Sequence, residues 1–127
     1  MSFLLNVLLT LTILSSNSVI NGKISDSEFQ KPIIGANIRI IQTNYGTHTN
    51  LQGYFELKNI KPGKYKIEYE ATGYVSMIDS IKLKPNQRLE LNIKLKKNKN
   101  TQKIEIKNKK KNKFKLLKGQ KKSSTLD

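Results

Sequence analysis

The chain has 127 residues, of which 36% are hydrophobic, and a formal net charge of +15. That length suffices for one domain with flanking segments. The absence of cysteine excludes a disulfide framework and a cysteine metal site. The chain has a single histidine, His48, whereas most zinc sites and His-based acid–base pairs would require a second one.

The positive charge is concentrated near the C-terminus. Residues 1–95 carry 11 Lys or Arg and 7 acidic residues, whereas residues 96–127 carry 13 Lys and 2 acidic residues. A strongly basic chain often binds nucleic acid. Here a basic tail follows a near-neutral body, so the overall charge is weak support for a nucleic-acid-binding domain.

The N-terminal segment, residues 1–18, is typical of a secretory signal peptide. Phe3 to Leu14 is apolar but too short to span a bilayer, which needs about 20 residues, so no transmembrane helix is expected. The small residues Ser16 and Ser18 predict cleavage after Ser18. No Lys or Arg precedes the apolar segment, so a buried first strand or helix is the alternative interpretation.

The body, residues 19–95, is predicted to be a series of short strands. Alternating apolar and polar residues, which place side chains on opposite faces of a strand, predict strands at 19–25, 36–41, 47–50, 53–57, 64–71, 75–83 and 88–95. Pro62-Gly63 forms a turn between two of these, which we interpret as half-buried antiparallel strands. No stretch has a helical period. The pattern predicts an all-β, seven-stranded antiparallel sandwich or barrel.

The apolar faces of these strands define a candidate core. The residues that we expect to be buried are Ile24, Ala36, Ile38, Ile40, Phe55, Leu57, Tyr65, Ile67, Tyr69, Ile81, Leu83, Leu89, Leu91 and Ile93.

An ordered series of turn-plus-strand motifs runs along the body: Gly22–Ile24, Lys31–Ile38, Gly46–Asn50, Gly53–Leu57, Asn59–Tyr65 and Ala71–Tyr74. In these motifs the body resembles carboxypeptidase-regulatory-like domains. This resemblance implies a transthyretin-like (prealbumin-like) β-sandwich. It also implies a frequent location after a signal peptide, at the N-terminus of TonB-dependent outer-membrane receptors of Bacteroidetes-type bacteria. We therefore expect secretion across the inner membrane, and residence in the periplasm or at the outer membrane.

The chain departs from this family in the loop before the Gly-x-Phe strand. Members often carry acidic residues there, whereas this chain has Asn50 and Gln52. Since a calcium site needs several charged oxygen ligands, we expect no metal in that loop. Further along, Lys103–Ile106 resembles the short strand with which such receptors engage their energy-coupling partner.

The chain lacks the combinations of residues that would support catalysis. Zinc carboxypeptidases need two histidines, and serines lie mainly near the two ends of the chain, away from His48. His48 is expected on an exposed polar strand. An intramolecular Lys–Asn amide would need types such as Lys23, Glu56 and Asn92, but alternation places Glu56 and Asn92 outward. We predict no catalytic, cofactor-binding or metal-binding residues.

The tail, residues 96–127, is predicted to be disordered because it has little apolar surface to bury. It is either a solvated extension or a segment attracted to an anionic surface. Phe114 stands alone, so stacking on nucleic-acid bases is not favoured.

These observations leave two functional hypotheses. The first is a non-enzymatic interaction or spacer domain, either a stand-alone copy or a fragment of a longer receptor, whose partners are proteins or outer-membrane receptor components. The second is a cationic protein that binds the cell envelope or an anionic polymer through residues 96–127.

Overall fold

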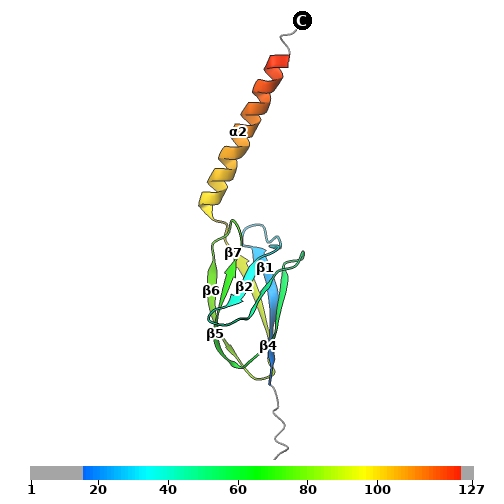
Figure 1. Cartoon of the computed structure of the whole chain (residues 1–127), viewed down its shortest axis with the longest axis vertical. Helices are drawn as coiled ribbons and strands as arrows, with labels where there is room; N and C mark the ends of the chain where they lie inside the picture. Colours follow the sequence, from blue (N-terminus) through cyan, green and yellow to red (C-terminus); the bar gives the residue numbers. More distant parts are fainter. Residues whose placement is uncertain (1–15, 124–127) are drawn as a thin grey trace, which may run out of the picture.

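The structure, a computed structural model, describes residues 16–123 and consists of a β-sandwich followed by one helix (Figure 1). The helix leaves one end of the sandwich and extends along the long axis of the molecule. The elements are β1 (Ser18–Asp26), β2 (Asn37–Ile40), β3 (Gly46–His48), β4 (Tyr54–Ile60), β5 (Gly63–Glu70), β6 (Met77–Leu83), β7 (Arg88–Leu95) and α2 (Lys99–Ser123).

The strands form two sheets, with the order β4-β1-β7 in sheet A and β3-β2-β5-β6 in sheet B. The predicted seven-stranded sandwich is therefore confirmed. One pairing differs from the antiparallel expectation, because β1 and β7 are parallel. Parallel neighbours need a long crossover between them. Here β2 to β6 supply it, a connection that local periodicity does not reveal.

The alternation of apolar and polar residues places one face of each sheet in the core. Along β1, buried and partly exposed residues alternate without interruption. Ten of the fourteen predicted core residues are buried, whereas Tyr65, Ile81, Leu89 and Leu91 are only partly buried. Four further residues, Ile20, Ile33, Ile60 and Leu95, are buried although they are not among the predicted core residues.

The turn at Pro62-Gly63 joins the two sheets and does not close a hairpin, because β4 belongs to sheet A and β5 to sheet B. Just before it, Asn59 has a φ of 58° and the β1–β4 register shifts. This irregularity ends the strict alternation of β4 and lets Ile60 face the core, where it is fully buried. That explains why the sequence pattern missed Ile60.

The start of β1 bears on the predicted signal peptide. The apolar segment Phe3–Leu14 lies outside the described residues, but Ser18 is the first residue of β1 and is buried. Its Oγ donates to the carbonyl of Lys84 at 2.6 Å and accepts from the Gln87 N–H at 3.0 Å. Cleavage after Ser18 would remove both hydrogen bonds, so Ser18 is part of the folded domain.

The helix α2 differs from the predicted disordered tail. Asn98 precedes it, and the Asn98 Oδ1 accepts the N–H of Asn100 at 3.1 Å, which is the geometry of an N-cap. The Lys, Leu and Gln residues that follow favour helix over other conformations. These local preferences act without tertiary burial, so a low apolar content does not exclude a helix here. Because α2 includes Lys103–Ile106, the predicted receptor-type strand there is wrong.

Among residues 16–123, no helix combines the length and the apolar character that a membrane crossing requires.

Gly22 allows β1 and β7 to approach each other. A Cβ at this position would lie 1.7 Å from the Leu91 carbonyl oxygen and 2.6 Å from its carbon, both of them backbone atoms. We expect Gly22→Ala to lower the free energy of unfolding by about 3 kcal/mol or more, as overpacking does in a rigid interior. Urea denaturation measures this, and Gly119→Ala, where a Cβ meets nothing within 4 Å, is the matched control. Equal midpoints for the two variants would contradict this account of Gly22.

Candidate functional site

His48 lies on β3 and is exposed, as predicted. It lines a shallow hollow of about 300 Å³ together with Asn50 and Glu56. The Glu56 carboxylate forms ion pairs with two side chains, Lys58 at 3.0 Å and Arg88 at 2.8 Å. The Lys58 hydrogen bond, with Arg88 nearby, lowers the pKa of Glu56 below its usual range. A carboxylate held ionised in this way is a poor proton acceptor for His48.

Asn50 has a structural role in the loop before β4. Its Oδ1 accepts the N–H groups of Gln52 and Tyr54, both at 3.0 Å, and so closes the turn before β4. Within residues 16–123 there is no group of three or more His, Cys, Asp or Glu side chains placed to hold a metal ion.

Lys23, Glu56 and Asn92 lie on the outer face of sheet A, where alternation placed the last two. The Asn92 Oδ1 accepts the backbone N–H of Lys23 at 3.2 Å, and the Lys23 ammonium lies 5.4 Å from the centre of the Tyr54 ring. The Lys23 amine is therefore engaged with an aromatic face, and this arrangement lends no support to a Lys–Asn amide.

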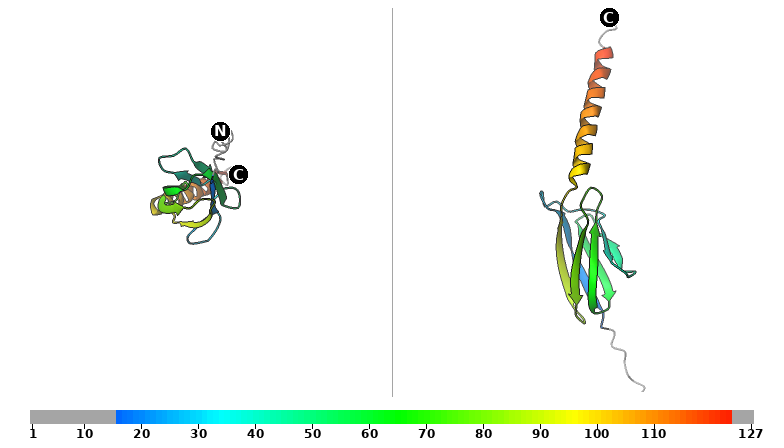
Figure 2. Two further views of the ribbon diagram at one scale, coloured as in Figure 1. Left: turned by 90° about the horizontal axis from the view of Figure 1, so that it is seen from below. Right: turned by 90° about the vertical axis from the view of Figure 1, so that its left-hand side faces the viewer.

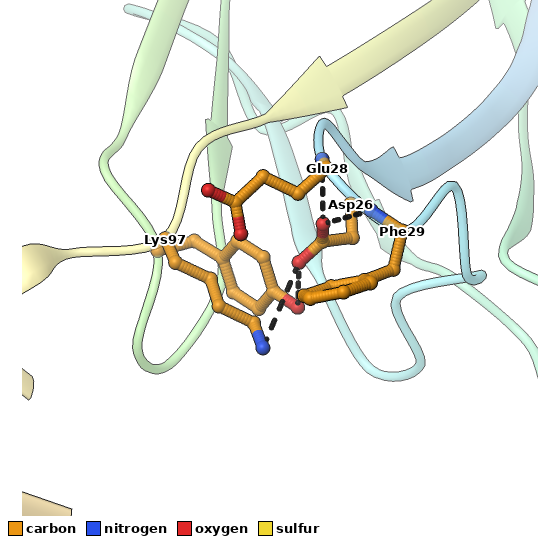
Figure 3. A network of polar contacts seen from close by, with 5 residues as sticks. Asp26, Glu28, Phe29 and Lys97 are labelled. Atoms are coloured by element: carbon orange, nitrogen blue, oxygen red, sulfur yellow. Dashed lines mark hydrogen bonds and ion pairs between the residues drawn. The ribbon is translucent and has the colours of Figure 1, made fainter. Parts of the chain in front are cut away.

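The most connected polar group lies at the end of the sandwich from which α2 leaves (Figure 3). Asp26, the last residue of β1, has a side chain only 3% exposed. Its Oδ1 accepts the N–H groups of Glu28 at 2.8 Å and Phe29 at 2.9 Å, and its Oδ2 accepts the Tyr74 hydroxyl at 3.0 Å. The Lys97 ammonium lies 4.0 Å from Oδ2 and 5.2 Å from the centre of the Phe29 ring.

This Asp26 cluster joins three segments that are distant in sequence: the end of β1, the corner before β6 and the segment between β7 and α2. Two backbone hydrogen bonds accompany it, from the Val75 N–H to the Lys96 carbonyl and from the Asn98 N–H to the Gly73 carbonyl, both at 2.8 Å. Both carboxylate oxygens of Asp26 are occupied. The cluster therefore anchors the base of α2 and does not offer a free acid or base.

Two side chains of the cluster have shifted pKa values: that of Asp26 is lowered and that of Tyr74 is raised. The Phe29 N–H, together with Glu28, Tyr74 and Lys97, lowers the pKa of Asp26. Burial, together with the hydrogen bond to Asp26, raises the pKa of Tyr74. The sequence contains a partial signal for this site, since Ala71–Tyr74 is one of the turn-plus-strand motifs and Asp26 directly follows the predicted strand 19–25.

One side of the sandwich carries two unpaired strand edges. Within the described residues, β6 pairs only with β5 and β7 pairs only with β1. The start of β6 adjoins the end of β7, where a hollow of about 200 Å³ lies between Met77 and Leu95. Figure 2 shows the two strands next to each other on this side. We call it the open side; the partly buried residues Ile81, Leu89 and Leu91 belong to its strands.

A shallow hollow of about 870 Å³ on the outer face of sheet B reaches the β6 edge. Its lining includes Lys64, Lys66 and Lys82, together with Ile78 and Ser80. Lys64 and Lys82 are direct cross-strand partners, and like charges opposite each other are destabilising. Within residues 16–123, none of these three lysines forms an ion pair. The hollow is therefore a positively charged surface beside an unpaired strand edge.

The second charged surface is α2. Its 25 residues include 11 Lys and one acidic residue, Glu105. The side chains described between Lys103 and Gly119 are exposed, including Ile104, Ile106, Phe114, Leu116 and Leu117. The helix therefore makes no apolar contact that would bury this segment.

The ionisation of the Asp26 cluster predicts the pH range over which it stabilises the fold. A lowered Asp26 pKa contributes stability above the unfolded value of about 4, and this is lost as the pH falls below it. A raised Tyr74 pKa contributes stability below about 10, and this is lost as the pH rises further. We expect the urea midpoint to fall at both extremes. Asp26→Asn should flatten mainly the acid limb and Tyr74→Phe the alkaline limb. An unchanged acid limb in Asp26→Asn would show that other carboxylates dominate.

Comparisons with solved structures show the same sandwich in proteins of different function. The TIE protein of Bacillus anthracis is 22% identical with a TM-score of 0.54, over 65% of this chain and 17% of that one. BcpA, the major pilin subunit of Bacillus cereus, is 19% identical with a TM-score of 0.53, over 65% and 31%. The 3-chlorocatechol 1,2-dioxygenase of Rhodococcus opacus 1CP is 12% identical with a TM-score of 0.52, over 66% and 61%.

This chain spans less than two thirds of each of those proteins, and at these identities the likeness concerns the fold alone. No curated protein matches the sequence. A family model described as "CarboxypepD_reg-like domain" matches residues 20–106, which include the whole sandwich except the first two residues of β1, and the start of α2. The resemblance seen in the sequence motifs is thereby confirmed, and the chain belongs to the CarboxypepD_reg-like domain family.

Proposed function

We propose that this chain is a secreted, non-enzymatic interaction or spacer domain on the periplasmic side of an outer membrane, comparable to the N-terminal accessory domain of TonB-dependent receptors. The observation that carries the proposal is the family match over residues 20–106. The apolar segment Phe3–Leu14, typical of a signal peptide, supports secretion. The engagement of Asp26 and Glu56 by neighbouring groups supports a non-catalytic role.

The spacer role is supported by the positions of the two chain ends of the sandwich. Because β1 and β7 run parallel, the start of β1 and the end of β7 lie at opposite ends of the sandwich (Figure 1). A chain that enters at one end and leaves at the other is lengthened by the domain.

The interaction role is supported by the open side. An extended partner segment could add to the β6 edge through main-chain hydrogen bonds, with its outward side chains next to Ile78, Ser80 and Lys82. Acidic residues in that segment would complement Lys64, Lys66 and Lys82, and inward apolar residues would cover the partly buried Leu89 and Leu91.

Secretion is tested by expressing the full chain in a Gram-negative host and by sequencing the N-terminus of the accumulated protein. We expect a processed chain that begins after Leu14 and no later than Ser18, recovered in the periplasmic or outer-membrane fraction. An unprocessed chain in the cytoplasm would overturn the proposal.

The same cells test the interaction surface. Because the chain contains no cysteine, Ser80→Cys provides a unique site on the β6 edge for a thiol-directed photocrosslinker. Lys58→Cys, on β4 at the opposite side of the sandwich, is the matched control. A defined adduct at position 80 and none at position 58 is expected. Equal labelling at both positions would contradict a specific β6 site.

A second function is favoured by the charge of α2: attraction to an anionic polymer or envelope surface. With 11 Lys against one Glu on an exposed helix, binding would be electrostatic and would weaken as salt rises. The isolated Phe114 offers little for base stacking, so acidic glycans or phosphate-bearing polymers fit better than single-stranded nucleic acid.

Deleting residues 99–127 tests this second function while it leaves Lys97 and the Asp26 cluster in place. We expect the truncated protein to elute from a heparin or phosphocellulose matrix at much lower salt than the full chain, because 11 of the lysines are removed with α2. Thermal unfolding of the sandwich serves as the control and should be nearly unchanged. Retention at the same salt concentration would show that α2 is a solvated extension.

A further inference from the structure

The first and last strands of the sandwich form one long parallel ladder. β1 and β7 are in register over eight successive residue pairs, from Val19 with Arg88 to Asp26 with Leu95. No bulge interrupts this register. β1 is the central strand of sheet A, so the ladder joins the N-terminal part of the domain directly to its C-terminal part.

The direction of the ladder determines how tension would act on it. The chain enters at the start of β1 and leaves at the end of β7, at opposite ends of the sandwich (Figure 1). A pull on the two flanking segments therefore draws β1 and β7 past each other along their length. The inter-strand hydrogen bonds are then loaded together, in shear. If both ends were pulled from the same end of the ladder, the bonds would instead break one after another.

Packing between the two strands opposes such sliding. Ile20 and Ile24 of β1 and Leu95 of β7 are buried on the core face. The Leu91 carbonyl oxygen lies 1.7 Å from the position that a Gly22 Cβ would take, so the two backbones approach each other more closely there than a side chain would allow. A shift of one residue would also turn every apolar side chain of the sliding strand away from the core.

Both ends of the ladder are fastened by contacts outside it. At the starting end, the Val19 N–H donates to the Gln87 carbonyl at 2.9 Å, and Ser18 Oγ bonds Lys84 and Gln87. At the other end, the Ser27 N–H donates to the Leu95 carbonyl at 2.9 Å, and Asp26 lies beside Lys97. Only three residues, 96–98, separate β7 from α2. A pull on α2 is therefore transmitted both to β7 and to the contacts that residues 96–98 make with Gly73, Val75 and Asp26.

We propose that this domain is a tension-resisting module, in which the β1–β7 ladder withstands a pull applied between the segments that precede and follow it. The inference deepens the spacer role proposed above and rests on that role only for where the tension would arise. A spacer that extended under small forces would not transmit a pull, whereas one whose terminal strands are loaded in shear keeps its length.

Single-molecule force spectroscopy on the full chain tests the proposal, because introduced cysteines are unique attachment points in a chain without native cysteine. Asn17→Cys with Lys96→Cys loads the ladder in shear. Asn17→Cys with Pro85→Cys loads it from one end. All three positions are exposed, so the fold should tolerate both pairs. At equal pulling speed we expect a several-fold higher unfolding force for the shear pair. A length gain of about 3.5 Å per released residue identifies complete unfolding.

Equal unfolding forces in the two geometries would overturn the proposal, as would gradual extension of the shear pair without a distinct unfolding event. Matching thermal unfolding curves for the two cysteine pairs confirm that both start from the same fold. The outcome is independent of the secretion test. A cytoplasmic, unprocessed chain with a high shear force would refute the cellular setting alone. A periplasmic chain with equal forces would refute the tension-resisting role alone.

Discussion

The pairing of β1 with β7 is the constraint on which the rest of the structure depends. It places the first strand between β4 and β7, so that sheet A exists only when the two ends of the domain have come together. Gly22 permits the close approach that this pairing needs. Its parallel direction sends the chain in at one end of the sandwich and out at the other, which gives the domain the geometry of a spacer.

The Asp26 cluster extends this constraint to the helix. Asp26 ends β1, Tyr74 precedes β6 and Lys97 follows β7, so one buried carboxylate connects three segments at the base of α2. A buried carboxylate is tolerated because N–H groups and a hydroxyl occupy both of its oxygens. The same occupation makes it unsuited to proton transfer. A polar network of this kind stabilises a fold without implying a reaction.

The candidate interaction surfaces arise where the sandwich is least complete. Tyr65, Ile81, Leu89 and Leu91 have the apolar character and alternation of core residues, yet they stay partly exposed on or beside the open side. Next to them, Lys64, Lys66 and Lys82 line a hollow without ionic partners among the described residues. The fold is shared by a pilin and a dioxygenase, so function here has to be argued from such surfaces and not from the architecture.

The sequence by itself determined which side chains face inward on most strands, because a period of two is a local property of extended chain. It also determined the family, through turn-plus-strand motifs whose order and spacing persist along the chain. It did not determine that Ile60 is buried, because Ile60 faces the core only through the irregular backbone at Asn59. The sequence does contain the Asn98 cap and the helix-favouring residues of α2, although the low apolar content of this segment by itself indicates disorder.

Tertiary structure alone decided which strands are neighbours. Periodicity indicates which face of a strand is buried but not which strand is its partner. It therefore could not predict three features: the parallel β1–β7 ladder, the crossing from one sheet to the other at Pro62-Gly63, and the open side. The Asp26 cluster has the same origin, because residues 26, 74 and 97 meet only after the strands between them have packed. Contacts between distant residues depend on the whole chain, whereas alternation and helix caps depend on a few neighbouring residues.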